Sequence, residues 1–283
     1  MIKSHKEKYT AFLFLLPSLI GVTVFCIAPY IICFVKSLYI GTTFVGLKNY
    51  IDLFQNKAFL LALKNTIVFT FIAIPLLMII SFLIALFLNS YKKISSFFRS
   101  ALIIPVVVPV ASLICVWQII FDDYGAVNNF LNSLGLNTIE FFNSGFSMIM
   151  IILIYVWKYS GFCVILFTAG LANVNHSLYE SARLDGANSF QLVTKITIPM
   201  ITPTTFFVFL MEIIYSFKIF REVFSLFGEY PYEDIYFIQN FINNNYHNLN
   251  YPRLSSASII LSVFIILILL IFFIFERKHS FAE

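Results

Sequence analysis

The sequence predicts an all-α polytopic membrane protein, and three observations lead to this fold class. Of the 283 residues, 60% are hydrophobic and only 11% are charged, whereas about a quarter of the residues in soluble proteins are charged. The mean hydropathy of +0.91 leaves too few polar side chains to cover a soluble fold of this size. The apolar residues also gather in long continuous runs, and about 20 such residues cross the hydrocarbon layer as a helix. The same composition disfavours a disordered chain, a nucleic-acid-binding domain and a disulfide scaffold.

Each apolar run predicts one membrane-spanning helix, and we treat 1–283 as a single transmembrane domain. The first run follows a basic segment, but Pro29-Tyr30-Ile31 is no small-residue cleavage site, so we expect a retained span rather than a signal peptide. The fifth run is the shortest and extends through Lys218 and Ile219 if protein covers its end. The predicted spans are Ala11–Val35, Thr66–Leu88, Ala101–Phe121, Phe146–Leu171, Ile201–Phe217 and Ser255–Phe275.

Basic residues near the span ends predict the orientation, because Lys and Arg are enriched on the cytoplasmic side. With the N-terminus inside, ten basic residues fall on the cytoplasmic side and seven on the outer side. The loop Asp122–Gly145 has no Lys or Arg, which marks it as an outer loop. Both termini are therefore predicted to be cytoplasmic. The net charge of +4 is a topology signal and implies no nucleic-acid partner.

The predicted cytoplasmic segment Asn173–Pro199 is longer than a simple connection between antiparallel helices. Ser177-Leu-Tyr-Glu180 matches the Ser-x-x-Glu capping box and predicts the start of a short helix. Gly186 fits a turn with positive φ, and Asn188-Ser-Phe-Gln191 offers a second cap. The segment thus predicts a helix-turn-helix that lies outside the bilayer and serves as a docking surface. In the alternative interpretation, Glu180 is only a helix cap and Gly186 only a turn residue. The side chains available for contact are Leu184, Ala187, Phe190 and Val193.

The run Glu180–Pro199 resembles the EAA loop of binding-protein-dependent ABC importers. In that family the motif is Glu-Ala-Ala, a Gly six residues after the Glu, and then Ile-x-Leu-Pro. Ser181, Val193 and Ile198 depart from the pattern, which affects fine packing rather than the docking role. The matching residues are Glu180, Ala182, Asp185, Gly186, Ala187, Ile196 and Pro199.

The resemblance extends over nearly the whole chain and is to the sugar-permease branch, similar to the larger membrane subunit of maltose transporters without its extra spans. The usual Gly-Gly-Pro stretch after the fifth span is replaced by Gly228-Glu-Tyr-Pro231, so the resemblance does not identify the sugar. Residues similar to those of such permeases are Phe44–Tyr50, Asn65, Thr66, Arg99, Pro105, Pro109, Trp117, Gly125, Trp157 and Gly161.

The resemblance implies a permease subunit of an ABC importer that translocates a carbohydrate. In that family two permease subunits, here expected to be related but different chains, enclose a path. Two cytoplasmic ATPase subunits bind the EAA loops, and an external binding protein delivers the solute. This chain has no Gly-x-x-x-x-Gly-Lys-[Ser/Thr] loop, so we expect ATP to be hydrolysed by the partner, no cofactor to be bound by this chain and no enzymatic activity. We expect it in the plasma membrane of a prokaryote.

Two ionisable side chains lie within the predicted spans, Lys158 in the fourth and Glu212 in the fifth. Such groups are costly in a bilayer and are often functional. We interpret them as part of the solute path, with an interhelical pair or a snorkelling lysine as the alternative. Before the sixth span lies a mixture of aromatic and amide side chains suited to sugars, although an interfacial aromatic belt accounts for most such aromatic residues. The residues of this outer cluster are Tyr230, Tyr232, Tyr236, Gln239 and Asn240.

Other functions fit the sequence less well. A permease for glycerol phosphate or another small polar solute stays an alternative, but a phosphate requires concentrated positive charge and Lys158 is the one basic residue well inside a span. A secondary transporter is expected to show inverted repeats and a midplane ion site, and the sequence shows neither. An intramembrane enzyme requires a catalytic or metal constellation, yet the four histidines fall in loops or tails.

Overall fold

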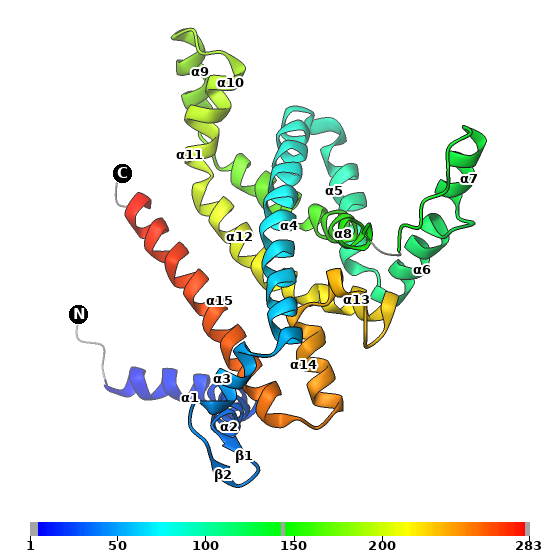
Figure 1. Cartoon of the computed structure of the whole chain (residues 1–283). Helices are drawn as coiled ribbons and strands as arrows, with labels where there is room; N and C mark the ends of the chain where they lie inside the picture. The colour runs from blue at the N-terminus through cyan, green and yellow to red at the C-terminus, as the bar shows by residue number, and fades with distance from the viewer. Residues whose placement is uncertain (1–4, 143–144, 281–283) are drawn as a thin grey trace. The chain divides into compact units, whose positions relative to one another are not determined.

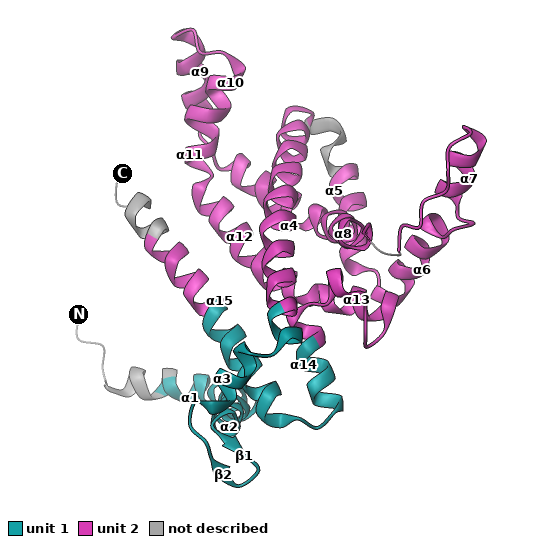
Figure 2. Ribbon diagram, in the orientation of Figure 1, with its two compact units in different colours: residues 1–60, 241–264 teal, residues 61–240, 265–283 magenta. Residues whose placement is uncertain are grey.

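The computed structural model describes residues 5–142 and 145–280 and is mostly helical (Figure 1). The chain divides into two compact units, which Figure 2 shows in different colours. Unit 1 comprises residues 1–60 and 241–264, and unit 2 comprises residues 61–240 and 265–283.

Unit 1 is formed by the N-terminal part of the chain and by a later segment that returns to it. Its elements are α1 (His5–Val22), the π-helical turn η1 (Thr23–Ile27), α2 (Ala28–Ser37), β1 (Tyr39–Ile40), β2 (Thr43–Phe44), α3 (Lys48–Phe54), the start of α4 (Lys57–Ser90), most of α14 (Ile238–His247) and the first part of α15 (Tyr251–Ser280).

Unit 2 holds the rest of α4, the start of α14 and the end of α15. Its other elements are α5 (Lys92–Val107), α6 (Val110–Phe121), α7 (Ala126–Ser133), α8 (Ser147–Ala172), α9 (His176–Leu184), α10 (Ser189–Leu192), η2 (Val193–Thr197), α11 (Ile198–Met200), α12 (Thr202–Ser216), η3 (Phe217–Ile219), α13 (Phe220–Phe227) and η4 (Glu233–Ile235).

Six helical runs among the described residues are long and apolar enough to cross a membrane, as the sequence predicts. Four of them contain or largely overlap the predicted spans. The third and the fifth differ. The runs are Phe12–Ser37, Lys57–Ser90, Val110–Ser133, Ser147–Ala172, Thr202–Phe227 and Tyr251–Ile274.

The third predicted span, Ala101–Phe121, is wrong as a single helix. The chain leaves the helical conformation at Val108 (ψ 134°) and Pro109 (ψ 140°), so α5 ends at Val107 and α6 begins at Val110. The cause is local, because a residue that precedes proline is disfavoured in the α region. Pro105 lies inside α5 without ending it.

The end predicted for the fifth span, Phe217, is also wrong. A short 3₁₀ turn, η3, follows α12 and leads directly into α13, so the apolar run reaches Phe227. Lys218 and Arg221 stay exposed on this run, whereas Glu222 is buried. A charged residue that is paired inside the protein does not have to end a span.

Two π-helical turns each end two residues before a proline. In η1 the amide of Ala28 donates to the carbonyl of Thr23, one residue before Pro29, and in η2 the amide of Ile198 donates to Val193, one residue before Pro199. A proline has no amide hydrogen and crowds the carbonyl four residues earlier. Widening the preceding turn lets the helix continue through each proline.

Unit 1 is held together by a buried amide and a short hairpin. The Asn49 side chain donates to the carbonyls of Ser37 (2.8 Å) and Tyr39 (3.1 Å) and so fixes the end of α2. Strands β1 and β2 pair antiparallel across Gly41 and Thr42. Gly41 has φ +60°, which fits a tight hairpin turn with glycine at its first central position.

Helix α8 forms the centre of unit 2, since buried residues occur all around it. It packs against α5 and α12. The approach of α5 is very close at Gly161, where an added Cβ would overlap the carbonyl oxygen of Leu102. Small residues permit such contacts between membrane helices. The burial of α8 carries several polar side chains into the interior of unit 2.

Candidate functional site

The predicted helix-turn-helix is present and consists of α9 and α10. The N-cap of α9 lies two residues earlier than predicted, because Asn175 occupies this position and accepts from the amide of Ser177 at 3.1 Å. The capping box predicted at Ser177 and Glu180 is therefore wrong. Glu180 is exposed and instead contacts Nδ1 of His176 at 3.2 Å, one helical turn away.

The turn between the two helices agrees with the prediction. Gly186 has φ +82°, and the amides of Gly186 and Ala187 donate back to the carbonyls of Arg183 (3.1 Å) and Ala182 (2.9 Å). This pair of bonds is the Schellman arrangement that ends a helix at a left-handed residue. Ala182 and Ala187 thus take part through their backbones, and the exposed Asp185 is the C-cap residue.

The second cap is also confirmed. The Asn188 side chain accepts from the Gln191 amide, and the Gln191 side chain accepts from the Asn188 amide, both at 2.9 Å. Beyond α10 the chain continues through η2, which contains the half-buried Ile196, into α11, which contains the exposed Pro199. Figure 1 shows α9 and α10 at one end of the run formed by α11 and α12.

Two large apolar side chains of the helix-turn-helix are strongly exposed, and a third, Leu178, is 40% exposed. Leu184 is 90% exposed and Phe190 is 75% exposed, whereas Ala187 and Val193 are half-buried. Apolar side chains exposed together on a locally capped helix-turn-helix are typical of a protein contact. Five of the seven residues of the predicted EAA-type loop lie in α9 and the turn that follows it, while Ile196 lies in η2 and Pro199 in α11. The docking role stays a prediction.

The two predicted intramembrane charges do not pair with each other. Lys158 of α8 forms a buried ion pair with Oε1 of Glu222 from α13. Both side chains are almost fully buried. The ammonium of Lys158 also lies 5.3 Å from the ring centroid of Tyr159, within cation–π range. The interhelical pair, one of the two interpretations of Lys158, is present with a partner that the sequence did not identify.

Glu212 of α12 is fully buried and contacts two other side chains of α8. The hydroxyl of Tyr155 donates to Oε2 at 2.7 Å, and the thiol of Cys163 donates to Oε1 at 3.0 Å. Cys163 is thus more than a small apolar side chain. A solute reaches Glu212 only if the surrounding helices separate, because the carboxyl group has no exposed surface.

Sequence reasoning missed Glu222 because the fifth span was predicted to end five residues earlier. A signal was available in Phe220, Val223, Phe224 and Phe227, which follow the i, i+3, i+4, i+7 spacing of an amphipathic helix. Tyr155 was missed as well. Tyr155, Tyr159 and Cys163 lie at four-residue intervals and so share one face of α8.

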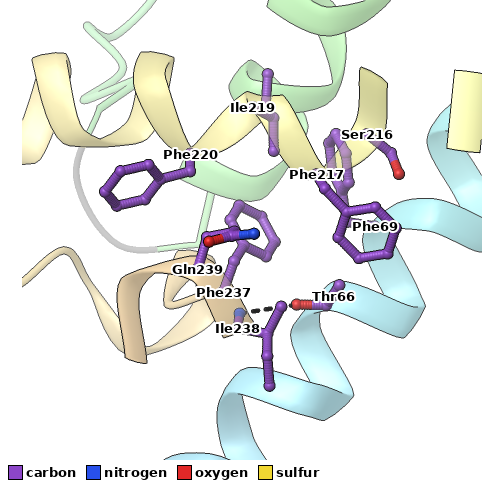
Figure 3. Close-up of a pocket in the computed structure, with 9 residues that line it drawn as sticks. All are labelled: Thr66, Phe69, Ser216, Phe217, Ile219, Phe220, Phe237, Ile238 and Gln239. Atoms are coloured by element: carbon purple, nitrogen blue, oxygen red, sulfur yellow. Dashed lines mark hydrogen bonds between the residues drawn. The ribbon is translucent and has the colours of Figure 1, made fainter. Parts of the chain in front are cut away.

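Two polar residues of α4 hold the segment that precedes α14. The Asn65 side chain donates to the carbonyls of Glu233 (2.6 Å) and Tyr236 (3.1 Å). The Thr66 hydroxyl accepts from the amide of Ile238 at 2.9 Å, as Figure 3 shows. These bonds fix the start of α14 against α4.

A small pocket lies beside this attachment, lined by Gln239, Thr66 and Ser216 among mostly aromatic side chains (Figure 3). Its volume of about 10 Å³ is room for about one water molecule. A sugar ring does not fit in this conformation. Gln239 is the predicted outer-cluster residue that lines the pocket.

The other members of the outer cluster lie in different surroundings. Tyr230 is largely exposed, and Tyr232 stacks edge-to-face on Phe227 with 5.6 Å between ring centroids. Tyr236 is held through its carbonyl by Asn65. Asn240 is fully buried and its Oδ1 accepts from the Phe237 amide at 3.1 Å. The five residues therefore do not form one sugar-sized site here.

Comparison with known proteins identifies the family to which the chain belongs. Residues 53–280 match the family described as binding-protein-dependent transport system inner membrane component. The chain is 34% identical over 230 residues to the arabinooligosaccharides transport system permease protein AraP of Bacillus subtilis, covering 78% of this chain and 73% of AraP. It is 30% identical over 271 residues to the trehalose/maltose transport system permease protein MalF of Thermococcus litoralis, covering 93% and 92%.

The fold is similar to that of a solved transporter. A chain in the crystal structure of a bacterial alginate ABC transporter, in complex with an alginate pentasaccharide-bound periplasmic protein, superposes with a TM-score of 0.86. The two chains are 25% identical, and the match covers 96% of each. With its six apolar helical runs and a family match over most of its length, this multi-pass membrane protein belongs to the family of binding-protein-dependent transport system inner membrane components.

Proposed function

We propose that this chain, as one permease domain, translocates a carbohydrate delivered by an external solute-binding protein, with energy from ATP hydrolysed on separate subunits. The observation that carries the proposal is the exposed apolar pair Leu184 and Phe190 on a capped helix-turn-helix that continues into a membrane span. The relatives named above support a saccharide as the solute, since AraP and MalF are both sugar permeases by name.

We infer that α9 and α10 bind a cytoplasmic ATPase subunit. Leu184 and Phe190 supply the apolar contact, while Glu180 and Asp185 remain exposed for polar contacts at its edge. The Schellman turn at Gly186 and the cap at Asn188 keep the two helices in a fixed arrangement. A movement of the ATPase is then passed through Ile196 and Pro199 into α12.

We infer that the solute path involves the buried cluster of Lys158 and Glu212, together with the outer cluster of Tyr230, Tyr232, Tyr236, Gln239 and Asn240. Lys158 is paired with Glu222, so the two side chains carry no net charge together. A neutral sugar that enters between the helices can exchange hydroxyl hydrogen bonds with such a pair. A phosphate would leave the Glu222 carboxylate facing a second anion, which disfavours glycerol phosphate.

The proposed assembly contains a second, related permease chain, two ATPase subunits and the binding protein in the plasma membrane of a prokaryote. We place both termini in the cytoplasm. This orientation puts α9 and α10 on the ATPase side and the segment around Tyr230 on the side of the binding protein.

The experiment is reconstitution of the full chain with its partner subunits in proteoliposomes. ATP-dependent uptake of a labelled oligosaccharide is expected only when the binding protein is outside and ATP is inside. Uptake driven by an ion gradient without ATP would contradict the proposal. The chain purified alone is expected to hydrolyse no ATP. ATP hydrolysis by the isolated chain would contradict the proposal that separate subunits hydrolyse it.

A further inference from the structure

A pocket of unit 1 lies between the end of the first apolar run and the start of the sixth. Lys36 belongs to the last turn of the first span, and Tyr251 and Pro252 begin the sixth. The pocket has a volume of about 590 Å³, within the usual range of about 300–1,000 Å³ for small-molecule sites. Its lining consists of Lys36, Tyr39, Ile40, Gly41, Asn248, Leu249, Asn250, Tyr251 and Pro252.

The walls of this pocket are built by local contacts. Asn49 holds the carbonyls of Ser37 and Tyr39, which fixes one wall. The other wall is the connection between α14 and α15, where the amide of Asn250 donates to the carbonyl of Asn245 at 2.8 Å. The thiol of Cys33 lies 3.9 Å from the carbonyl oxygen of Ser255, so α2 and α15 are in contact just beyond the pocket.

The electrostatics of the lining favour an anion. The nine lining residues include one lysine and no aspartate or glutamate. The Lys36 ammonium lies over the ring of Tyr251, 4.7 Å from its centroid, and this contact holds the charge at the pocket. The side-chain amide of Asn248 and the Nδ2 group of Asn250, whose Oδ1 already accepts from the Arg253 amide at 3.3 Å, add hydrogen-bonding groups suited to hydroxyls. The lining thus combines a cation for a phosphate group with polar groups for a hydroxylated substituent.

Leu249 has an unusual backbone for a leucine. Its φ is +55°, and it is the one described non-glycine residue with positive φ. It occupies the left-handed position that follows α14, where glycine is the usual residue. Its side chain is nevertheless 68% exposed. A strained residue with an exposed apolar side chain at the rim of a pocket indicates a contact that is completed by a bound molecule.

The position of the pocket identifies the kind of molecule. The side chains of α2 below Lys36, including Ile31, Ile32, Phe34 and Val35, are exposed along the first span. Lys and Tyr at span ends lie at the level of lipid headgroups. A ligand there has its anionic group at Lys36 and its apolar part against α2 and Leu249. Neither a soluble sugar nor a free phosphate uses this apolar surface.

We propose that this pocket binds the headgroup of an anionic phospholipid with a hydroxylated substituent, of the phosphatidylglycerol kind. Lys36 contacts the phosphate, the amides of Asn248 and Asn250 contact the hydroxyls, and Leu249 packs on the start of an acyl chain. The site is defined by the span ends and does not depend on which solute the protein carries.

The test uses the full chain in nanodiscs of phosphatidylcholine with a minor fraction of phosphatidylglycerol, and native mass spectrometry of the lipids that remain bound after release. The wild-type chain is expected to retain phosphatidylglycerol over phosphatidylcholine. Lys36→Met is expected to lower that preference about tenfold, the usual size of a lost charge-assisted hydrogen bond. Lys36→Arg is expected to keep it. Lys48→Met removes an exposed lysine of the same unit outside the pocket and is the matched control.

Leu249→Gly is the second variant, because glycine relieves the left-handed strain and the variant is not expected to unfold. It should reduce retention of the lipid about threefold while leaving the thermal unfolding temperature unchanged or higher. Equal retention of both lipids by the wild type, or unchanged preference in both Lys36→Met and Leu249→Gly, would overturn the site. Displacement of phosphatidylglycerol by soluble glycerol 3-phosphate would assign the pocket to a free phosphate and overturn the lipid assignment.

Discussion

The helix-turn-helix of α9 and α10 and the buried charges of α8, α12 and α13 are organised in opposite ways. Hydrogen bonds in the helix-turn-helix join residues two to five positions apart, as from Asn188 to Gln191. Bonds among the buried charges join residues 49 to 64 positions apart, as from Lys158 to Glu222. The helix-turn-helix exposes apolar side chains, whereas the buried region encloses charged ones. The helix-turn-helix is specified by local bonds, whereas the buried cluster is specified by how distant helices pack.

The largest expected effect is in the buried cluster. Lys158→Met should destabilise the chain by about 3–5 kcal/mol, since Glu222 is left buried without its partner. Denaturant unfolding in detergent measures the loss. The double variant with Lys158→Met and Glu222→Leu should recover most of it, because two apolar side chains leave no unpaired charge. A double variant as unstable as the single one would contradict the pairing.

A smaller effect is expected where α8 meets α5. Gly161→Ala places a Cβ against the Leu102 carbonyl and should cost about 1–3 kcal/mol through displacement of α5. Gly21→Ala is the matched control, because nothing lies within 4 Å of a Cβ at that helical glycine. Thermal unfolding in detergent compares the two. Equal unfolding temperatures for the two variants would show that α5 and α8 are not closely packed at Gly161.

In the helix-turn-helix, Gly186→Val forces a β-branched residue to φ +82° and should disrupt the turn. The expected loss of stability is about 1–2 kcal/mol, and we expect a larger effect on transport. We expect normal membrane insertion, weak ATPase binding and ATP hydrolysis uncoupled from uptake. Gly186→Asn tolerates the left-handed conformation and should retain coupling. Normal uptake and normal ATPase association of Gly186→Val would refute the docking role.

The smallest effect is expected at the cap of α10. Asn188→Ala removes the acceptor for the Gln191 amide and should cost about 1 kcal/mol of local helix stability. Hydrogen exchange of the α10 amides measures this loss. Ser189→Ala, at an exposed neighbour, is the control. If Asn188→Ala increases the exchange rate of the α8 amides more than that of the α10 amides, the cap does not act locally.

The accuracy of the sequence predictions follows the same division. The positive φ of Gly186 and the cap at Asn188 were predictable, because both depend on residues a few positions apart. Ser177 was the wrong cap because Asn175, two residues earlier, makes the bond instead. The spans were predictable as long apolar runs, but the position of the break in the third was not, because Pro105 and Pro109 both lie in that run and only Pro109 separates two helices.

The partners inside unit 2 were beyond sequence reasoning. Lys158 and Glu212 were identified as unusual because charged groups are costly in a bilayer. Which group each one contacts depends on how α8, α12 and α13 pack. The thiol of Cys163 illustrates this limit, since its spacing within α8 gives no sign of the Glu212 carboxyl group on another helix.

The attachment of α4 to the start of α14 has a consequence for biosynthesis. Asn65 bonds to Glu233 and Thr66 to Ile238, at sequence separations of 168 and 172 residues. Chains grow at about 5–20 residues per second, so the second span waits roughly 10–30 s for these partners to be made. During this interval Asn65 and Thr66 lack these partners, and the surrounding apolar residues of the span must offset the cost of placing them in the membrane. The second span is therefore inserted early and completed late.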